Sequence, residues 1–194
     1  MKKFSVKQLC ICAAMIALHI VLEFVSIRIG NDYKITLSVL PVIITAILYG
    51  PFSGGLVGLI GSVISQLLTY GITATTIYWI WPPAIHGLAV GLLFRAFGRR
   101  LSFRFGDRKA LSAVINPVTV CVFAGGLINT ICNYVATLLD SKVWGYYSEI
   151  YMIGLIPIRL VNWILTSALC SIITMVLIRV LGKMLSLDFY RKGE

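Results

Sequence analysis

The chain is poor in charged residues, and above all in acidic ones. Of its 194 residues only 12% are charged, and seven are Asp or Glu, whereas 59% are hydrophobic. A soluble domain carries about 25% charged and about 45–50% apolar residues. The mean hydropathy is +0.93. This composition excludes a disordered chain and argues against a soluble globular domain, because too few polar side chains are present to cover its surface.

The motifs of common enzymes are missing as well. The sequence has no GxxxxGK[ST] phosphate loop, no HExxH, no GxSxG and no CxxC. Its five cysteines fall inside apolar stretches, and Cys10-x-Cys12 has no His or acidic cluster beside it. We therefore expect no catalytic residues, no cofactor and no metal site, and we expect any ATP hydrolysis to come from other proteins.

Long apolar runs predict the fold, since a membrane-spanning helix needs about 20 apolar residues. We expect six helices, at residues 5–27, 35–49, 52–68, 78–97, 110–139 and 153–187. Gly50-Pro51 separates the second from the third. The first run is too long and continuous for a cleaved signal peptide, so we expect it to remain. The prediction is an all-α membrane protein, with residues 1–194 forming a single domain, a bundle of six transmembrane helices.

Basic residues predict the orientation of this bundle. The net charge is +10, and thirteen of the 17 Lys and Arg residues lie in the N-terminus, in the segment around 95–109 and in the C-terminus. Because cytoplasmic segments carry the excess of Lys and Arg, both termini are predicted to be cytoplasmic. Segments 28–34, 69–77 and 140–152 then face outside. The anionic membrane surface accounts for the charge, so we expect the lipid bilayer and not nucleic acid as a partner.

Small residues recur at four-residue spacing, which lets helix backbones approach closely in lipid. The patterns are Gly50-x-x-x-Gly54-x-x-x-Gly58, Gly87-x-x-x-Gly91 and Ala13-x-x-x-Ala17. We interpret the glycine patterns as packing within the bundle. The alanine pair fits internal packing or docking on another membrane protein, and composition does not choose between them.

Polar and aromatic side chains gather at the expected outer ends of four helices, most of them three or four positions apart. They are Ser62, Gln66 and Tyr70; Tyr78, Trp79 and His86; Asn129 and Asn133; and Arg159, Asn162 and Trp163. Buried amides and an arginine are costly in lipid, so they face the bundle interior or a wet cavity. Together with Thr75 and the cations Arg28 and Lys34, they predict an aromatic-walled pocket for a small molecule. The cations favour a ligand that carries a carboxylate.

These features also have purely structural interpretations. The tryptophans can form an interfacial belt, and each asparagine can hydrogen-bond between helices. Arg159 can neutralise Asp140 or Glu149. His19 and Glu23 lie one turn apart in the first helix, and we interpret them as a mutually satisfied pair, with a proton relay as the alternative.

The segment from Leu22 to Pro51 carries a family resemblance. It reads LEFVSIRIG…KITLSVLPVIITAILYGP and continues GGLVGLIGSVISQLL and GLAVGLLF. This sequence resembles the substrate-binding S component of energy-coupling factor (ECF) vitamin transporters, and among them the folate-type subfamily. The similarity covers about 13–97, and the last two helices are similar in hydropathy and length.

The resemblance implies a bundle of six helices that binds a vitamin from the outer side of a cell membrane, most commonly that of a bacterium. It also implies docking on a membrane coupling subunit driven by two ATPases, through a small-residue motif in the first helix that maps onto Ala13 and Ala17. The segment TYGITATTIYWIWPP is richer in Thr and Trp than the folate-type pattern. Folate is thus our first expectation, and riboflavin and pantothenate remain alternatives.

Two other classes of protein fit the sequence less well. An integral-membrane enzyme acting on a lipid or isoprenoid would use His19, Glu23 and His86, but it would need acidic residues at the cytoplasmic headgroup level, where this chain has mostly arginine. A self-sufficient transporter or channel would show inverted repeats or helices broken at mid-membrane. Neither feature is evident in the sequence.

Overall fold

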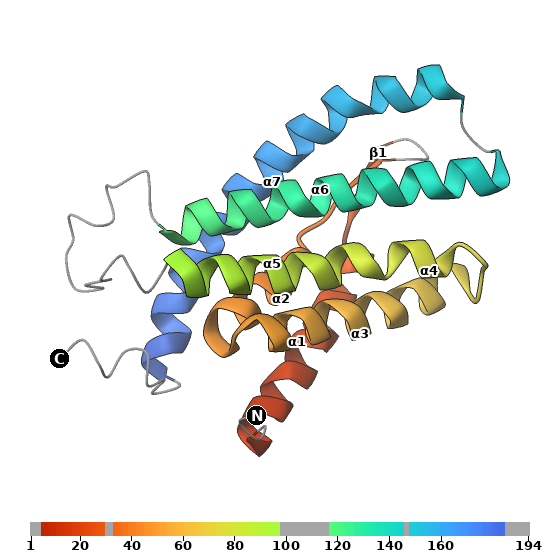
Figure 1. Ribbon diagram of the computed structural model, residues 1–194. Helices are drawn as coiled ribbons and strands as arrows, with labels where there is room; N and C mark the ends of the chain where they lie inside the picture. Colours follow the sequence, from red (N-terminus) through yellow and green to blue (C-terminus); the bar gives the residue numbers. More distant parts are fainter. Residues whose placement is uncertain (1–4, 30–32, 98–116, 146–147, 185–194) are drawn as a thin grey trace.

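The computed structural model describes residues 5–29, 33–97, 117–145 and 148–184. The elements in chain order are α1 (Val6–Phe24), β1 (Ile27–Ile29), β2 (Tyr33–Ile35), α2 (Val39–Tyr49), α3 (Pro51–Tyr70), α4 (Thr76–Trp79), α5 (Trp81–Phe97), α6 (Pro117–Trp144) and α7 (Glu149–Met184). The long helices pack in the order α1–α3–α5–α6–α7, and α2 packs against α1, α3, α5 and α7 (Figure 1). The fold is therefore a helical bundle arranged around one short helix.

Five helices of the described part are long and apolar enough to cross a membrane. They are α1, α3, α4 together with α5, α6 and α7. The predicted second helix is present as α2, but its 11 residues correspond to about 16 Å at 1.5 Å per residue. That is about half of the roughly 30 Å hydrocarbon thickness. Residues 40–46 of α2 are all buried, so this helix is enclosed by the others.

The junction of α2 and α3 follows from two adjacent residues. Gly50 has a φ of 98°, in the left-handed region that favours glycine, and Pro51 is the first residue of α3. A Cβ at Gly50 would meet nothing within 4 Å. Gly50 therefore serves the turn, unlike the glycines that follow it in the sequence pattern.

The other glycines of the patterns bring α3 against α2 and α5. A Cβ on Gly54 would meet Ala46, and one on Gly58 would meet the backbone of Pro83. Similarly, a Cβ on Gly87 would meet the backbone of Gly54. These close approaches confirm the interpretation of the glycine patterns as packing within the bundle.

The segment predicted as a loop after the first helix contains a hairpin. Strands β1 and β2 are antiparallel and pair Ile27 with Ile35, and Ile29 with Tyr33. The long elements are all helices, as predicted, and the correction concerns this segment alone. Ile-Arg-Ile and Tyr-Lys-Ile place β-branched and aromatic residues at alternate positions around Gly-Asn-Asp, a pattern typical of hairpins.

Other boundaries shift by a few residues. The fifth predicted helix continues to Trp144, and the sixth begins at Glu149, so the connection between them is shorter than predicted. The predicted helical residues 110–116 and 185–187, and the basic segment 98–109, lie outside the described residues.

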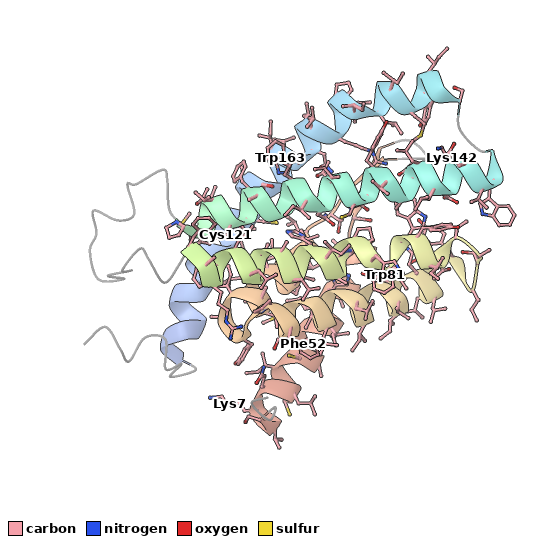
Figure 2. All side chains as sticks on the ribbon, in the orientation of Figure 1. Lys7, Phe52, Trp81, Cys121, Lys142 and Trp163 are labelled. Atoms are coloured by element: carbon pink, nitrogen blue, oxygen red, sulfur yellow. The ribbon has the colours of Figure 1, made fainter. Side chains whose placement is uncertain are left out.

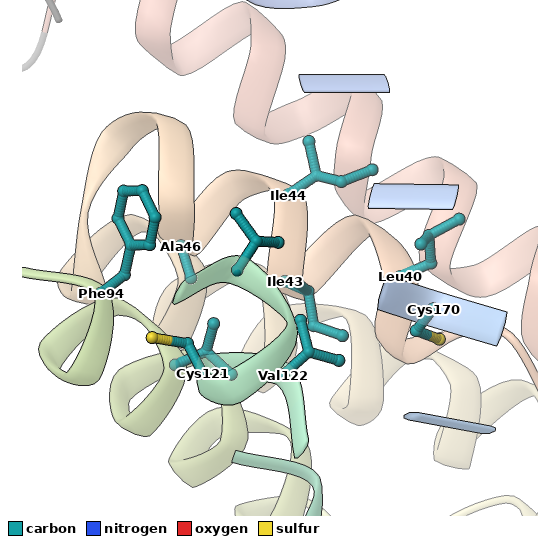
Figure 3. Packing of buried hydrophobic residues seen from close by; sticks show 10 residues of the cluster. Leu40, Ile43, Ile44, Ala46, Phe94, Cys121, Val122 and Cys170 are labelled. Atoms are coloured by element: carbon teal, nitrogen blue, oxygen red, sulfur yellow. The ribbon is translucent and has the colours of Figure 1, made fainter. Parts of the chain in front are cut away.

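The apolar core lies where α2 meets α5, α6 and α7. Figure 3 shows its packing. The buried members are Leu40, Ile43, Ile44, Ala46, Val90, Phe94, Val118, Cys121, Val122 and Cys170. Phe94 and Val118 belong to the end of the bundle where α5 ends and α6 begins, and the opposite end holds the turn between α3 and α4 and the connection of α6 to α7 (Figure 1).

Candidate functional site

A cavity of about 480 Å³ lies between α2, α3, α4, α5, α6 and α7. Its wall includes Tyr70, Thr73 and Thr75 at the α3–α4 turn, and Asp140 near the end of α6. The cavity therefore belongs to the end of the bundle that carries these two connections. It extends inward to Ile43 of α2, where it meets the apolar core.

The structure brings ten of the twelve predicted site residues together around this cavity. They are Gln66, Tyr70, Thr75, Trp79, His86, Asn129, Asn133, Arg159, Asn162 and Trp163. The other two, Arg28 and Lys34, oppose each other in the β1–β2 hairpin, and the structure describes only their backbone.

The prediction missed about half of the wall. The additional residues are Thr36, Val39, Ile43, Thr73, Val122, Gly126, Thr130, Asp140, Thr166, Ser167 and Cys170. Those on α6 and α7 continue the predicted stripes at spacings of three and four, so extending the stripes would have found them. Thr36, Val39 and Ile43 carry no such signal, because their position depends on how α2 is enclosed.

The amide side chains of the wall are held by bonds along their own helices. Asn133 donates from Nδ2 to the backbone oxygen of Asn129 at 2.9 Å and to its Oδ1 at 3.2 Å. Thr166 donates to Oδ1 of Asn162 at 3.1 Å. These bonds run along a helix, unlike the interhelical bonds considered as an alternative. They fix amide groups that can both donate and accept hydrogen bonds in the cavity wall.

Arg159 bridges α7 and α6. Its Nη2 donates to Oγ1 of Thr137 at 2.7 Å, and Thr137 in turn donates to the backbone oxygen of Asn133 at 2.8 Å. The guanidinium carbon lies 5.9 Å from the ring centroid of Tyr134. The cation is thus fixed in the wall by a hydroxyl and an aromatic face.

Trp163 is fixed on the same wall. Its indole Nε1 donates to the backbone oxygen of Phe123 at 2.9 Å, and the two rings meet edge to face with centroids 6.1 Å apart. A Cβ on Gly126 would come within 3.1 Å of Trp163 Cδ1, so glycine allows this approach. Figure 2 shows Trp163 on α7 where this helix runs beside α6. The indole N–H therefore points to the protein backbone, which differs from the belt geometry considered as an alternative.

His86 lies in the cavity wall and is 2% exposed. Among the described residues, neither of its ring nitrogens has a hydrogen-bond partner. A Cβ on Gly125 would come within 3.3 Å of His86 Cδ2, so α6 is close to the ring. A neutral imidazole has one donor and one acceptor, and both are left for water or a ligand here.

His19 and Glu23 of α1 form hydrogen bonds with the segment that precedes α2, unlike His86. His19 Nδ1 donates to the backbone oxygen of Ser38 at 2.6 Å, and Glu23 accepts from Thr36 Oγ1 at 3.4 Å. Both residues therefore hold the segment that leads into α2, whereas His86 lines the cavity. Within the described ranges, no group of three or more His, Cys, Asp or Glu residues could hold a metal ion.

Comparison with known proteins identifies the family. Residues 7–178 match the family described as ECF transporter, substrate-specific component. The fold is similar to that of ThiT from Listeria monocytogenes, with a TM-score of 0.64 and 21% identity over 87% of this chain and 93% of that one. It is also similar to the S component of a bacterial ECF transporter, with a TM-score of 0.61 and 19% identity over 92% of this chain and 97% of that one.

The two structural likenesses show the fold, and the family match shows the class. A comparison with curated proteins returned no match. The family consists of transporter components and not enzymes, and it consists of integral membrane proteins, in agreement with the five long apolar helices. Since the family match covers most of the sequence, this chain belongs to the substrate-specific components of ECF transporters.

Proposed function

We propose that this chain binds a water-soluble vitamin from the extracellular side and delivers it inward when docked on a coupling subunit with two ATPases. The observation that carries the proposal is the cavity of about 480 Å³. Its size lies within the roughly 300–1,000 Å³ of small-molecule sites, which combine aromatic walls with a few placed polar groups. Trp79 and Trp163 supply the aromatic surface, and Gln66, Asn133 and Arg159 supply polar groups.

Folate is our first candidate for the vitamin. Trp79 and Trp163 suit a flat heterocycle, Gln66 and Asn133 suit its ring or amide edges, and Arg159 suits a carboxylate. Riboflavin and pantothenate are the alternatives. The proposal is tested by mass spectrometry of the small molecule retained on the purified protein. A retained vitamin supports it, whereas a retained lipid or isoprenoid in the cavity would favour a membrane enzyme.

The proposed orientation has both termini in the cytoplasm, with the five long helices and the short, enclosed α2 as its six membrane segments. We expect a Ser148→Cys variant to react with a membrane-impermeant thiol reagent from outside and a Ser102→Cys variant to react only after permeabilisation, in a background without the native cysteines. Ser148 is exposed at the start of α7, and Ser102 belongs to the basic segment outside the described residues. Labelling of residue 102 in intact cells would contradict this orientation. It would mean that the cavity opens toward the cytoplasm.

Docking on the coupling subunit is assigned to Ala13 and Ala17 of α1. Both are exposed, and only 11% of the α1 span is buried. We expect the double change Ala13→Trp and Ala17→Trp to prevent assembly and to abolish uptake, because close backbone contact drives helix association in lipid. Ligand affinity of the isolated chain should stay within about threefold of wild type. Such a change in binding free energy is well below the roughly 1.4 kcal/mol that corresponds to a tenfold change in affinity.

A matched control uses Ile172→Trp and Val176→Trp. These residues are also four positions apart, on α7, and are 59% and 58% exposed. This control should assemble normally, and assembly can be measured by co-purification with the coupling subunit and ATPases. If the alanine variant assembled but lost ligand affinity, Ala13 and Ala17 would serve the internal structure instead.

A further inference from the structure

Asp140 contributes a carboxylate to the cavity wall. Its Oδ1 is buried and has no hydrogen-bond partner among the described residues. Burying an acceptor without a donor destabilises the protein, and burying a charged acceptor does so more strongly. A donor group on a bound ligand would supply the hydrogen bond that this oxygen lacks.

Among the described residues that line the cavity, the only other charged one is Arg159. Its Nη2 is directed to Thr137, which lies one turn before Asp140 on α6. The wall therefore presents one anion and one cation on neighbouring turns. The complementary ligand edge has a hydrogen-bond donor beside an acceptor, whereas a ligand edge with acceptors only would leave Asp140 unpaired.

We infer that the ligand presents a ring amino group to Asp140 and is therefore an amino-substituted nitrogen heterocycle. This inference rests on the proposed function and narrows its substrate class. The amino group donates to the Asp140 carboxylate, and an adjacent ring nitrogen or carboxylate accepts from Arg159. The unpartnered nitrogens of His86 supply a second polar contact for the ligand in the same wall. Trp79 and Trp163 provide the aromatic surface for the ring.

The test measures binding of four probes to the purified full chain by tryptophan fluorescence and calorimetry. Thiamin and folate carry a ring amino group, whereas riboflavin and pantothenate carry neither an amino group nor a positive charge. We expect thiamin or folate to bind at least about 100-fold more tightly than the other two, because a site built to pair with a ring amino group discriminates strongly against ligands without that group. If riboflavin or pantothenate bound most tightly, the inference would be wrong and the proposed function would stand.

Variants of Asp140 then test the contact with the tightest probe. We expect Asp140→Ala to weaken binding by about 100-fold and Asp140→Asn by about tenfold, since the asparagine keeps an acceptor but loses the charge. Glu149→Gln removes an acidic residue from the start of α7 and should bind within threefold of wild type. Asp140→Ala binding within threefold of wild type would overturn the inference. Binding of none of the probes, with no small molecule retained, would reject the proposed function as well.

Discussion

Gly87→Ala is expected to destabilise the protein strongly, although it adds a single methyl group. The new Cβ would meet the backbone of Gly54 and would come within 2.8 Å of the backbone nitrogen of Gly55. A backbone atom cannot move aside as a flexible side chain can, so α3 and α5 would have to separate. Overpacking of this kind costs about 1–3 kcal/mol. The midpoint of thermal unfolding in detergent should fall by about 5–10 °C, and Gly87→Leu should yield no folded protein.

Gly154→Ala is the matched control for this substitution. Gly154 is a helical glycine of α7 whose added Cβ would meet nothing within 4 Å. Alanine is a better helix former than glycine by up to about 1 kcal/mol, so this variant should be as stable as wild type or more stable. Both variants can be compared by size-exclusion chromatography after stepwise heating. Equal stability of Gly87→Ala and Gly154→Ala would show that the close approach of α3 and α5 is not required.

Arg159→Ala is expected to weaken binding of the retained vitamin about thirtyfold to several thousandfold. Loss of a charge-assisted hydrogen bond in a closed site costs about 2–5 kcal/mol. Arg159→Lys keeps the charge but not the planar fork, and should lie between wild type and alanine. Thr137→Val removes the hydroxyl that accepts from Nη2 at 2.7 Å. A loss of affinity in Thr137→Val would show how strongly binding depends on the position of the guanidinium. Calorimetry with the identified vitamin measures all three.

Trp163→Ala removes an aromatic surface from the same wall, and stacking and apolar burial of a ring contribute on the order of 1–3 kcal/mol. We expect affinity to fall about tenfold to 100-fold. Trp163→Phe keeps a ring but loses the bond to the oxygen of Phe123, so it separates the stacking surface from the anchor. If Arg159→Ala and Trp163→Ala both stayed folded and bound within threefold of wild type, the binding site would have to lie elsewhere in the bundle.

Hydropathy and helical spacing predicted most of this architecture. The apolar runs are long, and side chains three or four positions apart share a helix face, so the helices and the stripe from Asn129 to Asn133 could be found without a structure. The hairpin was missed because three-residue strands carry little periodicity, and the turn residues Gly30, Asn31 and Asp32 dominate that segment.

The environment of single side chains could not be predicted in the same way. Asp140 was considered as a counter-charge for Arg159, but the described bond of the guanidinium goes to Thr137, and Oδ1 of Asp140 has no described donor. The partner of Arg159 depends on the rotation of α7 against α6. Similarly, Thr36 joins the cavity because α2 is enclosed, and no local pattern in the sequence specifies that position.

The short central helix has a consequence for the permeability of the membrane. Ile43, Val122 and Cys170 belong both to the cavity wall and to the apolar core. The cavity therefore meets the apolar core at these three residues, and a hydrated ion would have to lose its water to pass through that core. We therefore expect that many copies of this chain in a membrane would not make the membrane permeable to ions. The same apolar core blocks the way inward. A bound molecule therefore has to leave through the opening by which it entered, unless the protein changes its shape or its position in the membrane.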